Sequence, residues 1–190
     1  GILYAPDVHN SVLGIGNVAA SKGARVSSFA FAKGSLCWDL ADIQARLATG
    51  GRGPGWLFVI PGQSNSSGIK HPIRLVTAMA RAAGWDVVLD AAALAPSGGL
   101  DMSSDSGVCP DFATISFYKI FGYPTGIGAL IAKKKTLNKL TKTWFAGGTV
   151  RVVSDPRVSG GNPHVSHGVT PLMHNKESAE HWEDGTINFQ

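Results

Sequence analysis

The stretch "GWLFVIPGQSNSSGIKHPIRLVTAMARAAGWDVVLD", residues 55–90, contains an apolar run, a polar turn, a helix-like segment and a second apolar run. The two apolar runs are 55–61 and 85–94, of which the second continues past the quoted stretch, and both are typical of buried strands. The segment between them opens with Pro72 near its first turn and closes at Gly84, which indicates a helix. A strand, a helix and another strand in this order predict two parallel strands joined by a helical crossover.

The same alternation continues on both sides of this stretch. Further strand-like runs occur at 1–5, 24–31, 112–118 and 126–132, and helix-like segments occur at 9–23 and 38–51. This order predicts an α/β fold with a mostly parallel sheet and helices on both faces. The polar segment 150–181, rich in Gly, Pro and His, is predicted to be a loop region.

Composition excludes several classes of protein. The chain has 190 residues, 44% of them hydrophobic, and a net charge of +4. It lacks an apolar run of the ~20 residues that a membrane span needs, so we expect no membrane partner. The basic cluster 132–142 has no interleaved aromatic residues, so we expect no nucleic-acid partner. The two cysteines, Cys37 and Cys109, fit a reducing compartment, and we expect a cytoplasmic protein.

Polar residues follow three of the predicted strands. "GQSNSSG" (62–68) follows the first strand of the opening stretch, Asp90 ends its second strand, and Lys119 ends the run that starts at 112. Ligands of parallel α/β sheets bind at the carboxyl ends of the strands. We therefore expect these three groups to face one crevice.

Lys119 is the most informative of these residues, because lysine is among the residues least often buried. A lysine at a strand end is typical of a Schiff base with a carbonyl or with pyridoxal phosphate. Such a cofactor also needs a carboxylate that keeps its pyridinium nitrogen protonated, and Asp90 is placed for that. Taken alone, Asp90 fits equally well as an aspartate that caps a helix at a strand-to-helix turn.

Six separated motifs support the cofactor interpretation. In chain order they are "PDVHNSVLG" (6–14), "GQSNSSGIKHP" (62–72), "VLDAAAL" (88–94), "ISFYKIFGYPTGIGALI" (115–131), "WFAGGTV" (144–150) and "HWEDGTINF" (181–189). In order and content they resemble the class V pyridoxal-phosphate enzymes, the NifS-like cysteine desulfurases. Three of them look most like the N-terminal domain of the molybdenum cofactor sulfurases. The resemblance implies an aspartate aminotransferase-like fold, with 1–190 as part of its large, cofactor-binding domain.

The resemblance also implies roles for individual residues. Lys119 would carry pyridoxal 5'-phosphate as a Schiff base, with Asp90 as the partner of the pyridinium nitrogen. His9 would stack on the ring face and pass a proton, Asn65 would donate to the phenolic oxygen, and Ser116 would bind the phosphate. Each has a simpler alternative: His9 at a helix start, Asn65 in an Asx-turn, and Ser116 as an ordinary strand hydroxyl.

Two further residues imply an assembly. Gly185 and Thr186 resemble the family segment that reaches the phosphate of a neighbouring subunit, which implies a homodimer with shared sites. Ala93 and Tyr118 stand where many bacterial cysteine desulfurases have Gln and His. The molybdenum cofactor sulfurases also have a small residue and a tyrosine at these places, so both differences favour that branch.

The chain does not begin with Met, and we expect it to be a fragment of a longer protein. By resemblance, the first phosphate-binding loop would precede residue 1. The persulfide-forming cysteine would follow residue 190, in a smaller C-terminal domain. Cys109 lies in the loop before the lysine strand and is better placed than Cys37 to accept sulfur, but we expect both to be ordinary thiols.

The implied function is pyridoxal-phosphate-dependent sulfur transfer from L-cysteine, with molybdenum cofactor as the ultimate acceptor by resemblance. Two alternatives stay open: a truncated or degenerate relative without turnover, and another class V activity such as C–S lysis or amino transfer.

Two other sequence patterns point to a nucleotide site and to a metal site, and both are weaker than the six motifs. "GIGNVA" (14–19) matches a dinucleotide-binding pattern but lies inside a helix-like segment instead of a strand-to-helix turn. Four histidines, His164, His167, His174 and His181, have no standard zinc spacing, and we predict no metal site.

Overall fold

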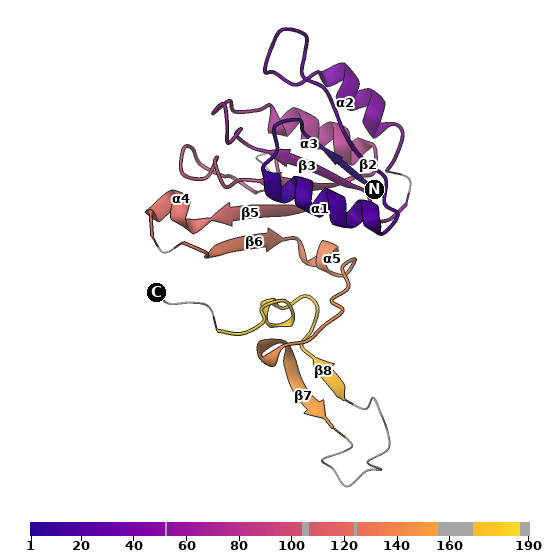
Figure 1. Cartoon of the computed structure of the whole chain (residues 1–190), viewed down its shortest axis with the longest axis vertical. Coiled ribbons are helices and arrows are strands. Elements are labelled where there is room, and N and C mark those ends of the chain that lie inside the picture. The colour runs from indigo at the N-terminus through magenta and orange to yellow at the C-terminus, as the bar shows by residue number, and fades with distance from the viewer. Residues whose placement is uncertain (52, 104–106, 124, 156–168, 187–190) are drawn as a thin grey trace. The chain divides into compact units, whose positions relative to one another are not determined.

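Figure 1 shows the computed structural model of the chain, which describes residues 1–51, 53–103, 107–123, 125–155 and 169–186. The chain divides into two compact units, Gly1–Ala132 and Lys133–Gln190, which we describe separately. Within the described residues, no helix has the length and apolar character needed to cross a membrane.

The first unit is built on a six-stranded sheet. Its strands are β1 (Ile2–Tyr4), β2 (Val26–Ser28), β3 (Leu57–Pro61), β4 (Asp86–Asp90), β5 (Phe112–Ser116) and β6 (Gly128–Ala132). They lie in the order β2-β1-β3-β4-β5-β6. The pairs from β2 to β5 are parallel, and only the edge strand β6 runs antiparallel to its neighbour. The predicted mostly parallel sheet is therefore confirmed (Figure 1).

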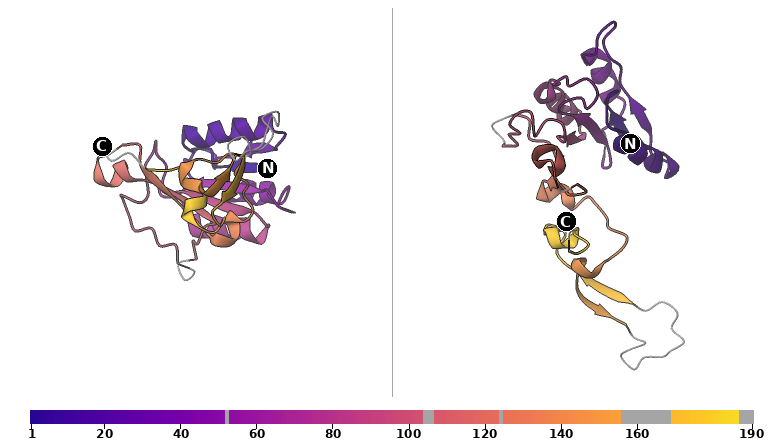
Figure 2. Two further views of the ribbon diagram at one scale, coloured as in Figure 1. Left: turned by 90° about the horizontal axis from the view of Figure 1, so that it is seen from below. Right: turned by 60° about the vertical axis from the view of Figure 1, so that its left-hand side comes forward.

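Helices cover both faces of this sheet, as predicted. They are α1 (Asn10–Ser21), α2 (Leu40–Leu47) and α3 (Ile73–Ala82), and the short α4 (Phe117–Phe121) follows the end of β5. Side chains of a strand point alternately to its two faces. Phe58 and Ile60 of β3 belong to one buried cluster with residues of α2 and α3, whereas Val59 packs in a second cluster with Val12 of α1. The turned views of Figure 2 allow the helices on the two faces to be followed.

The sheet changes its direction of growth between β1 and β3. The chain passes from β1 to β2 on one side, and from β3 to β4 on the other side. In open α/β sheets the crevice for a ligand lies at such a switch point, outside the carboxyl ends of the strands. The loops that leave β1 and β3 at this edge carry His9 and Asn65.

The region around Lys119 differs from its predicted form. We expect a strand over 112–118, but β5 ends at Ser116 and Lys119 lies in α4. The ladder with β6 ends where Ser116 pairs with Gly128. A Cβ atom on Gly128 would collide with the carbonyl oxygen of Ile115, so the two chains approach this closely only because position 128 is glycine. Beyond this pair the chain leaves the sheet and turns into α4.

The second unit contains strands where we expect loop. Its elements are α5 (Lys134–Leu137), the 3-10 turn η2 (Gly147–Thr149), β7 (Val150–Ser154), β8 (Thr170–Met173) and the 3-10 turn η3 (Ala179–His181). Part of the segment 150–181 therefore forms β7 and β8, which pair antiparallel. The β-branched run "VRVVS" of β7 favours extended backbone, a signal that the many polar residues of the segment obscured. Residues 156–168 lie outside the described residues.

Candidate active site

Five of the seven predicted site residues line one pocket at the carboxyl edge of the sheet. The pocket has a volume of about 390 Å³. The predicted residues that line it are His9, Asn65, Asp90, Ser116 and Lys119. They come from the loops after β1 and β3, from the end of β4, and from β5 and α4. The three polar groups expected to face one crevice therefore do so.

Lys119 is held by Asn65. The Lys119 Nζ atom donates a hydrogen bond of 2.8 Å to Asn65 Oδ1. Asn65 follows β3, and Lys119 lies in the first turns after β5, so two strand ends deliver the contact. Because the amide oxygen is taken up by the lysine, the Asn65 Nδ2 group is the part of the amide that can donate to a ligand. Lys119 itself is half-buried.

Asp90 ends β4 with one carboxylate oxygen engaged. Its Oδ1 atom accepts a hydrogen bond of 3.0 Å from the Ala92 amide and one of 3.4 Å from Thr114 Oγ1. Thr114 is its direct neighbour in the β4–β5 register. Within the described part of the chain, Oδ2 has no hydrogen-bond partner. Asp90 thus caps a turn, as its simpler interpretation requires, and still presents a second carboxylate oxygen at the pocket.

His9 is the N-cap residue of α1. Its Nδ1 atom accepts a 3.2 Å hydrogen bond from the Ser11 amide and lies 3.0 Å from Ser11 Oγ. An Nδ1 that accepts from a backbone amide leaves the proton of the neutral ring on Nε2. The simpler interpretation of His9 as a residue at a helix start is therefore also correct. The cap fixes the tautomer and direction of a ring that lines the pocket.

Ser116 and Tyr118 precede Lys119 by three positions and one position, and both line the pocket. Ser116 holds the N-cap position of α4, but its side chain makes no capping hydrogen bond, so its hydroxyl stays available to a ligand. Tyr118 is 42% exposed. Ala93, the small residue that follows Asp90 by three positions, lines the same pocket.

The structure adds four polar pocket residues that have no individual role in the predicted site. These are Asp7, Ser11, Gln63 and Thr114. Thr114 could have been found from strand periodicity, because it lies two residues before Ser116 and shares its face. Gln63 lies two residues before Asn65 in the loop after β3, and its Oε1 accepts a hydrogen bond from Ser97 Oγ. No periodicity points to Asp7, whose partners lie far away in the sequence.

Gly185 and Thr186 belong to the second unit and follow an anchored aspartate. Asp184 accepts hydrogen bonds from Lys142 Nζ and, at 3.3 Å, from Trp144 Nε1. The Lys142 hydrogen bond, assisted by that from Trp144, holds the pKa of Asp184 below its ordinary value.

The predicted glycine motifs of this unit pack on each other. A Cβ atom on Gly148 would lie 2.9 Å from the Cα atom of Gly185 and 2.9 Å from the carbonyl oxygen of Glu183. The strings "GGT" (147–149) and "EDGT" (183–186) thus form one local structure that requires glycine at position 148.

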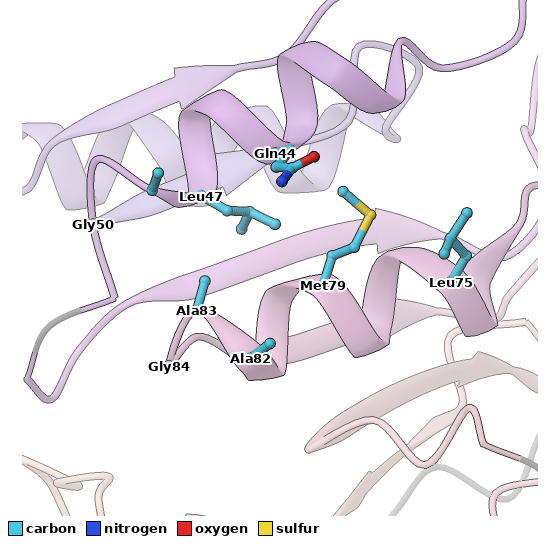
Figure 3. Close-up of a pocket in the computed structure, with 9 residues that line it drawn as sticks. Gln44, Leu47, Gly50, Leu75, Met79, Ala82, Ala83 and Gly84 are labelled. Carbon is cyan, nitrogen blue, oxygen red and sulfur yellow. The ribbon is translucent and has the colours of Figure 1, made fainter.

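A larger hollow of about 860 Å³ lies between α2 and α3 (Figure 3). Apolar side chains such as Leu47, Leu75 and Met79 dominate its lining, and Gln44 is the one polar side chain there. None of the predicted site residues lines it. The groups that can exchange protons or bind an anion are in the smaller pocket, so we assign the chemistry to that pocket.

The weaker signals find little support. Gly14 and Gly16 of the dinucleotide-like string lie inside α1, not at a strand-to-helix turn. In the described ranges, no group of three or more His, Cys, Asp or Glu side chains is arranged to hold a metal ion. His164 and His167 fall outside those ranges. Neither Cys37 nor Cys109 is among the residues that line the site pocket.

Comparison with known proteins gives a consistent result. The sequence pattern of the aminotransferase class-V family matches residues 2–174, and the chain belongs to this family. It is 35% identical over 195 residues to molybdenum cofactor sulfurase of Bos taurus, and 34% identical over 194 residues to molybdenum cofactor sulfurase 2 of Culex quinquefasciatus. Each alignment covers 98% of this chain but only 20% and 22% of the relative, so the chain spans about a fifth of these proteins.

Solved structures support the fold. The apo cysteine desulfurase of Thermococcus onnurineus NA1 matches with a TM-score of 0.75 and 24% identity, over 98% of this chain and 41% of that chain. The cysteine desulfurase CsdA of Escherichia coli matches with a TM-score of 0.69 and 22% identity, over the same shares. The aspartate aminotransferase-like fold is therefore confirmed, as is the resemblance on which it was predicted.

Class V aminotransferases depend on pyridoxal phosphate, and the pocket residues fit this group. The pocket combines an amine at Lys119 with a carboxylate at Asp90 that retains an unengaged oxygen. It also contains an amide with an available donor at Asn65 and, at Ser116, a hydroxyl that makes no capping hydrogen bond to α4. These are the groups that a pyridinium nitrogen, a phenolic oxygen, an aldehyde and a phosphate require.

Proposed function

We propose that the chain is the cofactor-binding part of a pyridoxal-phosphate-dependent enzyme that transfers sulfur from L-cysteine. The chemistry is that for which its relatives, the molybdenum cofactor sulfurases and cysteine desulfurases, are named. The observation that carries the proposal is the 2.8 Å contact between Lys119 Nζ and Asn65 Oδ1 in a pocket that also contains Asp90.

When bound, pyridoxal phosphate supplies an electron sink for charge that develops on the α-carbon of an amino acid. Lys119 Nζ attaches the cofactor and afterwards moves protons between the carbons of the substrate, because it is the amine among the pocket-lining residues. Asp90 Oδ2 would accept a hydrogen bond from the pyridinium N–H and so keep this nitrogen protonated, and Asn65 Nδ2 would donate to the phenolic oxygen. Ser116 Oγ donates to the phosphate.

His9 orients the ring of the cofactor and exchanges a proton with the substrate. Because Ser11 engages Nδ1, the Nε2 atom is the one that gives or takes this proton. In the overall reaction the C–S bond of L-cysteine breaks and the carbon skeleton takes up a proton and leaves as alanine. The sulfur forms an S–S bond with an acceptor thiol, which becomes a persulfide.

The partners are part of the same proposal. The acceptor thiol belongs to a cysteine other than Cys37 and Cys109, since neither lines the pocket. Gly185 and Thr186 bind the phosphate held by a second subunit, so the enzyme is a homodimer. Molybdenum cofactor as the final acceptor and a cytoplasmic location remain predictions from the sequence.

Turnover tests this proposal. The product of the full-length open reading frame, loaded with pyridoxal phosphate, should convert L-cysteine to alanine and persulfide faster than it converts other amino acids. Lys119→Ala should abolish this reaction. Lys70→Ala is the matched control: its amine is bound to the Ser97 carbonyl, and it does not line the pocket. Alanine formation that is no faster from cysteine than from other amino acids would exclude desulfuration and favour another class V reaction.

A further inference from the structure

A buried carboxylate joins three loops at the edge of the sheet that carries the pocket. Asp7 Oδ1 accepts a 3.1 Å hydrogen bond from Trp38 Nε1, and Asp7 Oδ2 lies 2.7 Å from His71 Nε2. Asp7 belongs to the loop after β1, Trp38 to the segment after β2, and His71 to the loop after β3. Trp38 and His71 lie 31 and 64 positions from Asp7 in the sequence, so only the fold brings the three residues together.

The geometry of this cluster is tightly constrained. The side chains of His71 and Asp7 are 1% and 9% exposed. The indole ring of Trp38 stacks on the imidazole of His71, with centroids 3.8 Å apart and planes 12° from parallel. The hydrogen bond sets the direction of the imidazole Nε2 atom, and the stack sets the plane of the ring.

The cluster is linked to two residues of the proposed site. Asp7 lies two residues before His9, the N-cap of α1. His71 closes the loop that carries Asn65, because its amide donates to the Gly62 carbonyl at 3.2 Å. The Gly62 amide in turn donates to the carbonyl of Asp90 at 2.9 Å. The Asp7–His71 contact therefore ties the loop of His9 to the loop of Asn65 and, through Gly62, to the end of β4.

We infer that Asp7, His71 and Trp38 form a positioning network that holds His9 and Asn65 in place at the pocket. This inference rests on the proposed function of those two residues. Asp7 lines the pocket, but each of its oxygens is committed to a partner within the protein. Its role is therefore to position other residues and not to contact the substrate.

Hydrogen exchange in the cofactor-free full-length protein tests the link between the loops directly. His71→Leu should speed amide exchange in residues 5–11, and Asp7→Ala should speed it in residues 62–71, each by about 5- to 100-fold, as expected for loss of a buried hydrogen bond. Asp111→Ala is the matched control. Asp111 is also a buried carboxylate, 7% exposed and 3.7 Å from an Arg81 nitrogen, but it precedes β5 at the opposite edge of the sheet. The inference is overturned if the exchange in each loop responds only to substitutions within that loop, or if Asp111→Ala has the same effect.

Kinetics of the loaded enzyme provide the second test. Asp7→Ala should lower kcat by about 10- to 100-fold, the range expected when reacting groups are misplaced. The effect should be smaller on a His9→Ala background, because Asp7 acts in part through His9. His71→Gln, which keeps a nitrogen donor near the position of Nε2, should retain more activity than His71→Leu. Equal effects of Asp7→Ala on both backgrounds, or equal loss in the two His71 variants, would contradict the inference. Failure of the proposed function would show differently, as absence of turnover in the unmodified enzyme.

Discussion

The side-chain amine of Lys119 lies 2.8 Å from the amide oxygen of Asn65, although 54 positions separate the two residues. Each residue follows the carboxyl end of a strand, β3 for Asn65 and β5 for Lys119, and β4 with Asp90 lies between those strands. The parallel arrangement therefore places an amide, a carboxylate and an amine at neighbouring strand ends. A single crevice can then use all three on one ligand.

Asn65 is expected to contribute to the affinity for the cofactor without being needed for its attachment. Asn65→Ala removes the acceptor for Lys119 and the proposed donor to the phenolic oxygen. A hydrogen bond of this kind contributes about 1 kcal/mol, so the dissociation constant for pyridoxal phosphate should rise roughly 5- to 10-fold. Titration followed by visible absorbance measures it. Ser66→Ala, a loop substitution outside the residues that line the pocket, should leave the constant unchanged. Equal constants for Asn65→Ala and the unmodified protein would exclude the donor role.

Asp90→Asn separates the structural role of Asp90 from its chemical role. Asparagine can still accept the bonds from Ala92 and Thr114, so the free energy of unfolding should change by less than about 1 kcal/mol. Its neutral amide cannot stabilise a pyridinium proton, so kcat should fall by at least about 100-fold. Chemical denaturation and turnover of L-cysteine are the two measurements. Thr114→Val, which removes only the weaker hydrogen bond, should change kcat much less. An Asp90→Asn variant with unchanged kcat would show that Asp90 serves only as a turn cap.

Acid should weaken the Asp7–His71 cluster. Burial opposes ionisation of Asp7, but hydrogen bonds from His71 and Trp38 outweigh it and hold the pKa of Asp7 below its ordinary value of 3.8. In the acid range the folded protein therefore binds fewer protons at Asp7 than the unfolded chain does. The contribution of Asp7 to the free energy of unfolding is fully present above pH 3.8, and it is lost as the pH falls through the lower pKa of the folded state. Urea unfolding across this acid range should show a smaller acid-induced loss for Asp7→Ala than for the unmodified protein. Parallel losses in the two proteins would contradict the assignment.

The packing of the two glycine motifs in the second unit predicts a sharp contrast between neighbouring positions. Gly148→Ala places a methyl group 2.9 Å from backbone atoms of Glu183 and Gly185, so we expect a destabilisation of about 1–3 kcal/mol. Among the described residues, its two chain neighbours aside, no atom lies within 4 Å of a Cβ added at Gly147, so Gly147→Ala should be close to neutral. Thermal unfolding of the two variants tests this contrast. Similar melting temperatures for both would show that the contact between the motifs is absent in solution.

Much of the first unit could be predicted because its signals are local. Hydrophobic runs, Pro72 and Gly84 defined the βαβ stretch that became β3, α3 and β4. The position of Lys119 at the carboxyl edge of the sheet agrees with the prediction, but its location in α4 does not. The end of β5 depends on the close approach of Gly128 in β6 to the backbone of Ile115, which the sequence pattern does not show. The antiparallel direction of β6, which the chain reaches through α4, is likewise not revealed by hydrophobicity alone.

The parts of the site that escaped prediction depend on long-range contacts. The cluster of Asp7, Trp38 and His71 joins residues from three loops, and none of the three stands out by spacing or by type. The simpler interpretation of His9 and its proposed role both agree with its cap geometry, because a side chain can cap a helix with one nitrogen and present the other. The two roles of His9 are therefore compatible and not alternatives.

Covalent trapping at Lys119 tests the central claim most directly. The full-length protein would be incubated with pyridoxal phosphate, reduced with borohydride, digested and analysed by mass spectrometry. We predict that the reduced cofactor is attached to the peptide that contains Lys119 and is absent from Lys119→Ala, while Lys70→Ala is labelled like the unmodified protein. Attachment that survives Lys119→Ala, or a protein that takes up no cofactor at all, would contradict the assignment of this pocket as a pyridoxal-phosphate site.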